Sequence, residues 1–256
     1  MILMAISLSM NAALWGLVSG SALIIGGLIA YFKTVPKKLI AFIMAFGGGV
    51  LISALAFNLM DEAYKRGGFD STAIGFILGA GIYSVANHYI NKKGAKHRKR
   101  SGIQQSGEEK TAGSGLAIAL GSLLDGIPES IAIGISMLEG GVVSVAAVVA
   151  IFLSNIPESL SSTSGMKQNG RTPRYIFGIW IGITLLSGLA SFCGYTIFKN
   201  FSPEVIAATI AVAAGAILAM LSETMMPEAF EEGHDYIGVV TVLGFLAGFI
   251  LTKSGV

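Results

Sequence analysis

Long apolar runs, separated by short polar connections, follow one another along the whole chain. Each run covers about 20 residues, the length that an α-helix needs to cross the hydrocarbon core of a bilayer. The runs lack the polar faces that a soluble helical bundle would present to water. We therefore expect an all-α, polytopic membrane protein with eight transmembrane helices, at residues 8–31, 39–61, 71–91, 114–138, 142–164, 175–198, 204–226 and 236–253.

The composition agrees with this class of protein. Of the 256 residues, 53% are hydrophobic and 12% are charged, whereas soluble chains carry about 25% charged residues. Cys193 is the single cysteine, which excludes a disulfide framework or a thiolate metal cluster within one chain. The first apolar run is too long for a removable signal peptide. We expect one transmembrane domain over residues 1–256 in contact with the lipid bilayer.

The basic residues gather in alternate connections. If the N-terminus lies outside, the connections 32–38, 92–113, 165–174 and 227–235 face the cytoplasm and hold 13 of the 17 lysines and arginines. Positive charge is enriched on the cytoplasmic side of membrane proteins. The pattern predicts a multi-pass protein of the plasma (inner) membrane with both termini extracytoplasmic.

The connection at 92–113 is polar, with a basic cluster at Lys96–Arg100 and a Gly/Ser/Glu-rich end. Such a composition is typical of a flexible segment, so we expect a flexible basic cytoplasmic loop. Orientation already explains its charge, and we expect no nucleic-acid partner.

Small residues recur four positions apart within three of the runs, which predicts close helix packing in lipid. The pairs are Gly75/Gly79, Gly178/Gly182 and Gly244/Gly248.

The tetrapeptide Ile-Pro-Glu-Ser occurs twice within apolar runs, at Ile127–Ser130 and Ile156–Ser159. Proline removes a backbone hydrogen bond from a helix, and a charge at the bilayer centre costs roughly 3 kcal/mol or more unless it has a partner. The same costly pair on two adjacent spans predicts a binding site on an ion or proton pathway.

Spans four and five form an antiparallel hairpin if the chain turns near Gly140. Asp125 then lies level with Asn155. Glu129 lies one turn toward the outside, and Glu158 lies about one turn toward the inside. Three carboxylates cannot all stay ionised at this depth unless a cation or proton neutralises them. The hairpin therefore predicts a site for divalent cations.

Further oxygen ligands lie beside these carboxylates. Ser154 shares a helix face with Glu158, and the two prolines free the carbonyls of Leu124 and Leu153. A structural polar network between the helices is the alternative. Serine or threonine usually suffices for that purpose, and the spans contain no Lys or Arg to pair with three acids.

Two other spans contribute candidate ligands. Asn58 and Asp61 lie at the outer end of span two, where Asp61 is equally well explained as part of a solvated helix end. Ser222 and Glu223 lie toward the inner end of span seven. Of the glutamates on span seven, Glu223 is expected to be better buried than Glu228 and to extend the pathway inward.

These strings resemble the motifs of the ZIP family of divalent metal transporters. The family has Pro-Glu cores on spans four and five, as in Asp125–Ser130 and Ser154–Ser159 here, and the segment Glu223–Glu228 is similar to its span-seven pattern. The resemblance implies inverted repeats, spans 1–3 and 6–8, around a central 4–5 hairpin. It also implies a homodimer, with Glu129 and Glu158 as ligands at the core of the site.

The chain departs from the family pattern at three positions. Asp125 and Ser154 stand where the family usually has histidine, and Gly126 replaces an asparagine. The predicted ligands are thus almost all oxygen atoms. Imidazole suits zinc, whereas carboxylate and carbonyl oxygens suit manganese or magnesium. Zinc is the metal that the family implies, and manganese, iron(II), cobalt and cadmium stay open.

The function that we expect is transport of a divalent cation into the cytoplasm, with the metal as bound substrate and no cofactor. No ATP-binding GxxxxGK[ST] motif is present, so gradients would drive it. An intramembrane hydrolase is the first alternative, but its serine needs an adjacent base and no histidine lies mid-span. A metal sensor that binds without transport is the second. We expect no enzymatic activity.

Overall fold

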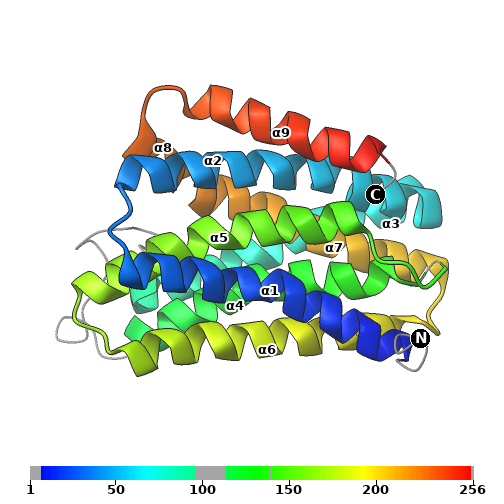
Figure 1. The fold of residues 1–256 in the computed structure, drawn as a ribbon. Helices are drawn as coiled ribbons and strands as arrows, with labels where there is room; N and C mark the ends of the chain where they lie inside the picture. The colour runs from blue at the N-terminus through cyan, green and yellow to red at the C-terminus, as the bar shows by residue number, and fades with distance from the viewer. Residues whose placement is uncertain (1–6, 96–113, 139, 255–256) are drawn as a thin grey trace.

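The computed structural model shows a bundle of long helices that run back and forth along one direction (Figure 1). The structure describes residues 7–95, 114–138 and 140–254. Within these ranges the regular structure is helical and no strand occurs, which confirms the all-α prediction. Most of the connection predicted to be a flexible basic loop, residues 96–113, lies outside the described residues.

The apolar runs fall on helices. Nine are α-helical in the described ranges: α1 (Leu8–Phe32), α2 (Lys37–Ala54), α3 (Met60–Ile90), α4 (Ser114–Ser136), α5 (Val145–Gln168), α6 (Pro173–Phe198), α7 (Pro203–Met220), α8 (Met226–Gly233) and α9 (Ile237–Lys253). Three π-helical segments continue α2, α3 and α7, namely η2 (Leu55–Leu59), η3 (Asn91–Ala95) and η4 (Leu221–Met225).

Five of the described helical stretches are long and apolar enough to cross a membrane. They are Leu8–Phe32, Lys37–Lys93, Val145–Gln168, Pro173–Phe198 and Pro203–Gly233, and Ile237–Lys253 is a shorter apolar helix. Helices of this length and composition are typical of a polytopic membrane protein.

The second and third predicted spans are joined without a polar loop. The chain is helical across the expected connection at 62–70 apart from Gly68, where the backbone leaves the helical region with φ 69° and ψ −169°. Glycine adopts positive φ without steric cost, and the chain turns back along the bundle there (Figure 1). The turn between the two spans thus lies within the predicted connection, although the polar residues around Gly68 are helical.

The fourth and fifth predicted spans are joined by a turn in which Gly140 and Gly141 have positive φ. This confirms the turn that we expected near Gly140. The two helices nevertheless pack mainly on other partners. Helix α4 lies against α6, whereas α5 lies against α1 and α2. The hairpin is therefore splayed, and its two arms approach the centre of the bundle separately.

Close helix contacts occur at two of the three predicted small-residue pairs. A Cβ atom at Gly79 would collide with the carbonyl oxygen of Val212 on α7, and one at Gly244 would collide with that of Phe46 on α2. At Gly178 and Gly182 an added Cβ would meet nothing within 4 Å. The prediction was wrong for this pair because spacing defines a shared face but not what that face meets.

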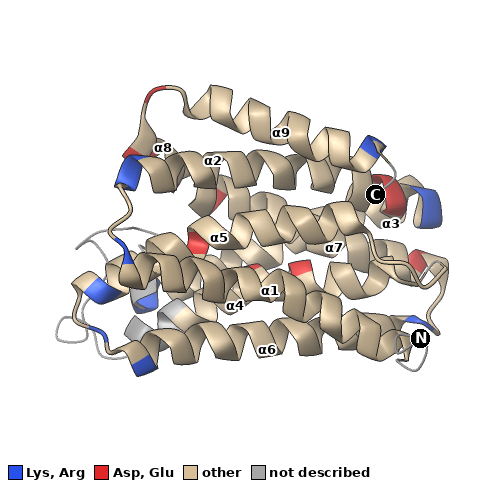
Figure 2. Ribbon diagram, viewed as in Figure 1, with Lys and Arg blue, Asp and Glu red and all other residues tan. Residues whose placement is uncertain are grey.

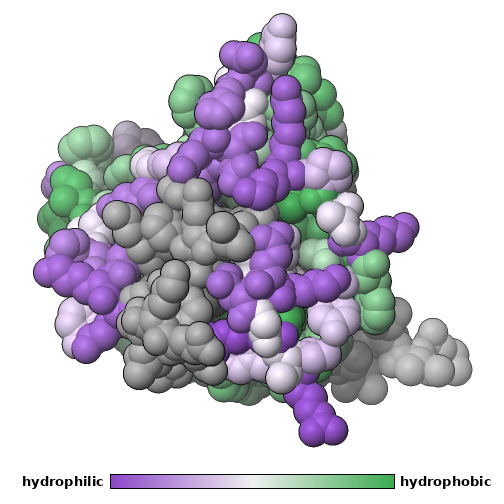
Figure 3. Space-filling model, turned by 90° about the vertical axis from the view of Figure 1, so that its left-hand side faces the viewer, coloured by the Kyte–Doolittle hydropathy of each residue, from purple (hydrophilic) through white to green (hydrophobic). Residues whose placement is uncertain are grey.

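Charged residues mark the two ends of the bundle. Figure 2 shows Lys and Arg at the ends, whereas Asp and Glu also occur partway along it. The end that carries the α1–α2 and α5–α6 connections presents a hydrophilic surface (Figure 3). Large hydrophobic side chains such as Ile77, Leu185 and Val242 are exposed on the helices between these ends.

Candidate metal-binding site

The structure buries three carboxylates within the helices that carry the repeated Pro-Glu motif. Asp125 and Glu129 are one turn apart on α4, and each is 2% exposed. Glu158 on α5 is 7% exposed. A buried charge is stable where hydrogen bonds or an opposite charge compensate for lost water. The surroundings of each carboxylate therefore decide what it can do.

Asp125 is held by a tyrosine of another helix. The hydroxyl of Tyr83 on α3 donates a hydrogen bond of 2.6 Å to Oδ1 of Asp125. Sequence reasoning missed Tyr83, because one tyrosine within an apolar run reads equally well as a packing residue. A polar tip at the depth of a buried acid is the signal that could have found it.

Glu223 on η4 is held by the same stretch of α3. Ser84 Oγ donates to Glu223 Oε1, and Asn87 Nδ2 donates to Oε2 at 2.8 Å. Contrary to expectation, Glu223 is exposed, whereas Glu228 is 8% exposed. A π-helical turn holds one residue more than an α-helical turn. Residues within and after η4 therefore lie on other helix faces than a regular 3.6-residue period predicts.

Two polar residues of α5 lie close to Glu158 in sequence, and both are buried. Ser154 Oγ donates to the carbonyl of Ile151 at 2.9 Å. Asn155 Nδ2 donates to the carbonyl of Ser19 on α1 at 3.2 Å. Since the amide nitrogen of Asn155 is used to hold α1, its side-chain oxygen is the atom that suits a metal ion.

The serines of the two motifs shape the helices around the prolines. Ser130 Oγ donates to the carbonyl of Gly126 at 2.8 Å, and Ser159 Oγ donates to that of Asn155 at 3.0 Å. Bonds of this type to the preceding turn often bend helices. These serines were not among the predicted metal ligands. The equivalent bonds show that the two motifs adopt the same local structure.

The carbonyl of Leu153, which Pro157 leaves without its helical donor, faces α2. A Cβ atom at Gly47 would lie 3.1 Å from this oxygen, so the glycine lets the two backbones approach. The position suits helix packing at least as well as metal binding.

Two of the predicted ligands, Asp61 and Ser222, lie at the surface, and a third, Asn58, is half-buried. Asp61 is exposed and forms an ion pair with Lys65, with Nζ 2.7 Å from Oδ2. Ser222 is exposed, and its hydroxyl donates to the carbonyl of Leu218 at 2.9 Å. Asn58 is half-buried within η2, and its Nδ2 atom has no hydrogen-bond partner among the described residues.

The described part of the chain contains no group of three or more His, Cys, Asp and Glu side chains placed to hold one metal ion. The candidate ligands instead come from α4, α5 and η4, with α3 holding two of them. Coordination in this arrangement would have to combine fewer carboxylates with amide, hydroxyl or carbonyl oxygens. Otherwise α4 and α5 would have to move together.

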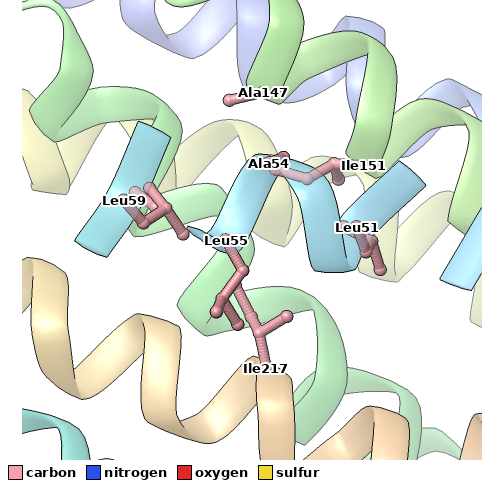
Figure 4. Close-up of a pocket in the computed structure, with 8 residues that line it drawn as sticks. Leu51, Ala54, Leu55, Leu59, Ala147, Ile151 and Ile217 are labelled. Atoms are coloured by element: carbon pink, nitrogen blue, oxygen red, sulfur yellow. The ribbon is translucent and has the colours of Figure 1, made fainter. Parts of the chain in front are cut away.

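An apolar layer lies between the carboxylates and the end of the bundle that carries the α4–α5 turn. It surrounds a cavity with room for about one water molecule, about 10 Å³ (Figure 4). The lining residues are Leu51, Ala54, Leu55, Leu59, Ala132, Ala147, Ile151 and Ile217. Without polar partners, water or a hydrated ion gains nothing there. The layer therefore disfavours the passage of a hydrated ion on this side of the carboxylates.

Comparison with known proteins identifies relatives of nearly the same length. No protein-family model matches the chain. The zinc transporter ZupT of Clostridium perfringens is 23% identical over 269 residues, which cover 94% of this chain and 93% of that protein. The zinc transporter ZupT of Akkermansia muciniphila is 25% identical over 259 residues, which cover 91% and 92%.

Both relatives are named as transporters, which agrees with the expectation that this chain is not an enzyme. Their similarity extends over nine tenths of the chain, well beyond the two Pro-Glu motifs. The resemblance to the ZIP family is thereby confirmed.

Proposed function

We propose that the chain carries divalent metal cations, zinc first among them, into the cytoplasm through a site formed by Asp125, Glu129, Asn155 and Glu158. The observation that carries this proposal is the burial of three carboxylates within long apolar helices. The similarity to two zinc transporters supports the choice of substrate.

Charge balance favours a cation as the substrate. The ion pairs of Lys37 with Glu232 and of Lys65 with Asp61 lie near helix ends, away from the carboxylates of α4 and α5. A divalent cation that passes between these helices would offset two negative charges, and its loss of water would be repaid by carboxylate oxygens.

The proposed topology has eight spans with inverted repeats, spans 1–3 and 6–8, around α4 and α5. Equivalent packing supports it. Helix α2 packs on α9 as α7 packs on α3, and α1 packs on α5 as α6 packs on α4. The π-helices agree too, since η2 follows an α2 of 18 residues and η4 follows an α7 of 18 residues. Such repeats are common in transporters.

Individual contacts follow the same relation. A Cβ atom at Gly49 on α2 would collide with the carbonyl of Thr241 on α9, and one at Gly215 on α7 would collide with the carbonyl of Phe76 on α3. In each of these two helix pairs, the partners approach closely at a glycine, and the two glycines occupy corresponding positions in the proposed repeats.

The apolar layer supports a direction for transport. With both termini outside, the α4–α5 turn and the apolar layer lie on the extracytoplasmic side of the carboxylates. A metal ion in this state would leave toward the cytoplasm, past the exposed Glu223 held by α3. Opening of the layer would admit the next ion from outside. Alternating access of this kind requires one part of the bundle to move against the other.

Metals other than zinc belong to the proposal because the candidate ligands are oxygen atoms. Manganese, iron(II), cobalt and cadmium are the cations to compare with zinc. A homodimer and a location in the plasma membrane also stay part of the proposal, on the strength of the family resemblance.

Metal flux into proteoliposomes tests the proposal. The purified protein should move zinc down its gradient, and Glu129→Gln and Glu158→Gln should each abolish most of the flux while the protein stays folded. Glu204→Gln is the matched control, because Glu204 is exposed at the start of α7. Metal binding without flux would favour the sensor, and absence of both binding and flux would overturn the metal site.

A further inference from the structure

The bond between Tyr83 and Asp125 is enclosed within the bundle. Tyr83 is 1% exposed and Asp125 is 2% exposed, and their oxygen atoms are 2.6 Å apart. The two residues are 42 positions apart, on α3 and α4. A short hydrogen bond to a carboxylate, shielded from water, is stronger than one at the surface.

This bond restricts how Asp125 can bind a metal ion. The terminal torsion of an aspartate is broad, so a carboxylate without a fixed partner adopts a range of orientations. Here Oδ1 accepts the tyrosine hydroxyl, which restricts the rotation of the carboxylate. Asp125 then meets a metal ion from a narrower range of directions, and less rotational freedom is lost when the ion binds.

The same stretch of α3 orients a second carboxylate. Ser84 and Asn87 hold both oxygens of Glu223, and Tyr83 and Asn87 are one turn apart on one face of α3. One helix thus orients candidate ligands from two other helical segments, α4 and η4.

We infer that Tyr83 is a positioning residue of the metal site, which sets the direction from which Asp125 binds the cation. This inference rests on the proposed function, because it takes Asp125 as a ligand. Residues that orient metal ligands typically contribute 10–100-fold to metal affinity. The proposal differs from a structural role, because a bond that merely joins α3 to α4 would leave zinc affinity unchanged.

The first test is zinc flux by Tyr83→Phe, which removes the hydroxyl and keeps the ring. We expect the KM for zinc to rise about tenfold, with the maximal rate unchanged. The matched control is Thr163→Val, which removes a buried hydroxyl that accepts a bond of 2.8 Å from Trp180 Nε1 between α5 and α6. Its KM should equal that of the wild-type protein.

A double-mutant cycle assigns the effect to Asp125. In the Asp125→Ala background the further change Tyr83→Phe should leave the KM where it is, because the ligand that Tyr83 orients is gone. The visible absorption of bound cobalt(II) gives a second readout. It should change in Tyr83→Phe and stay unchanged in Thr163→Val.

The outcomes separate the two proposals. A wild-type protein that neither binds nor moves zinc overturns the proposed function, and this inference with it. Active wild-type protein with an unchanged KM in Tyr83→Phe overturns this inference alone. So does a tenfold effect that persists in the Asp125→Ala background, or a fall in maximal rate at constant KM.

Discussion

Asn87 of α3 donates a hydrogen bond of 2.8 Å to Oε2 of Glu223, a residue that follows it by 136 positions in the chain. Ser84, on the same helix, donates to the other carboxylate oxygen. Both oxygens of Glu223 are thus held by α3. A movement of α3 against η4 would break these hydrogen bonds and release the carboxylate. Whether Glu223 is available as a ligand therefore depends on how the two helices are placed.

Asn87→Ala tests how much this contact stabilises the fold. A hydrogen bond to a charged group contributes about 1.5–3 kcal/mol, and exposure of Glu223 reduces this contribution to about 1 kcal/mol. We expect the melting temperature in detergent to fall by about 2–4 °C. His88→Ala is the control, because His88 is exposed on the same helix. An equal fall in both variants would contradict the assignment.

Gly79→Ala should weaken the contact between α3 and α7. The added methyl group would collide with the carbonyl of Val212, and overpacking of this kind costs about 1–3 kcal/mol. Gly81→Ala is a close control, since a Cβ there meets nothing within 4 Å and alanine favours the helix. Thermal unfolding should show a lower midpoint for Gly79→Ala alone, and equal midpoints would argue against the close approach.

Cysteine labelling tests the predicted orientation. Cys193→Ser removes the one native thiol, and single cysteines then replace Gln168 or Ser254, both of which are exposed. We expect an impermeant maleimide to label Ser254→Cys in intact cells, because the predicted topology places the C-terminus outside. Gln168→Cys should react only after the membrane is opened. The reverse pattern would invert the topology and the proposed direction of transport.

The apolar layer predicts a second difference in labelling. Ala54 lines the cavity and is 5% exposed, whereas Val142 near the α4–α5 turn is 70% exposed. In the background without Cys193, the thiol of Val142→Cys should react with an impermeant reagent from outside. That of Ala54→Cys should stay protected without metal. Rapid modification of Ala54→Cys would mean that the resting protein is open to the outside.

Comparison of Asp125 with Gly178 shows how far sequence reasoning reaches. A carboxylate in an apolar run must be buried or expelled from the membrane, so the burial of Asp125 follows from its position in the sequence. Gly178 and Gly182 have the spacing of packing residues, yet their face meets nothing within 4 Å. The metal-binding role of Asp125, Glu129 and Glu158 stays a prediction.

The amino-acid sequence by itself determined the class of protein, the helical runs and the acids buried within them. It did so because apolar length and the cost of a charge in hydrocarbon are properties of a single segment. The tertiary structure decided which donors hold each carboxylate, as Tyr83 holds Asp125, and it splayed α4 from α5. These features depend on which faces of distant helices meet. Side-chain packing between the helices sets those contacts, and no local sequence pattern encodes them.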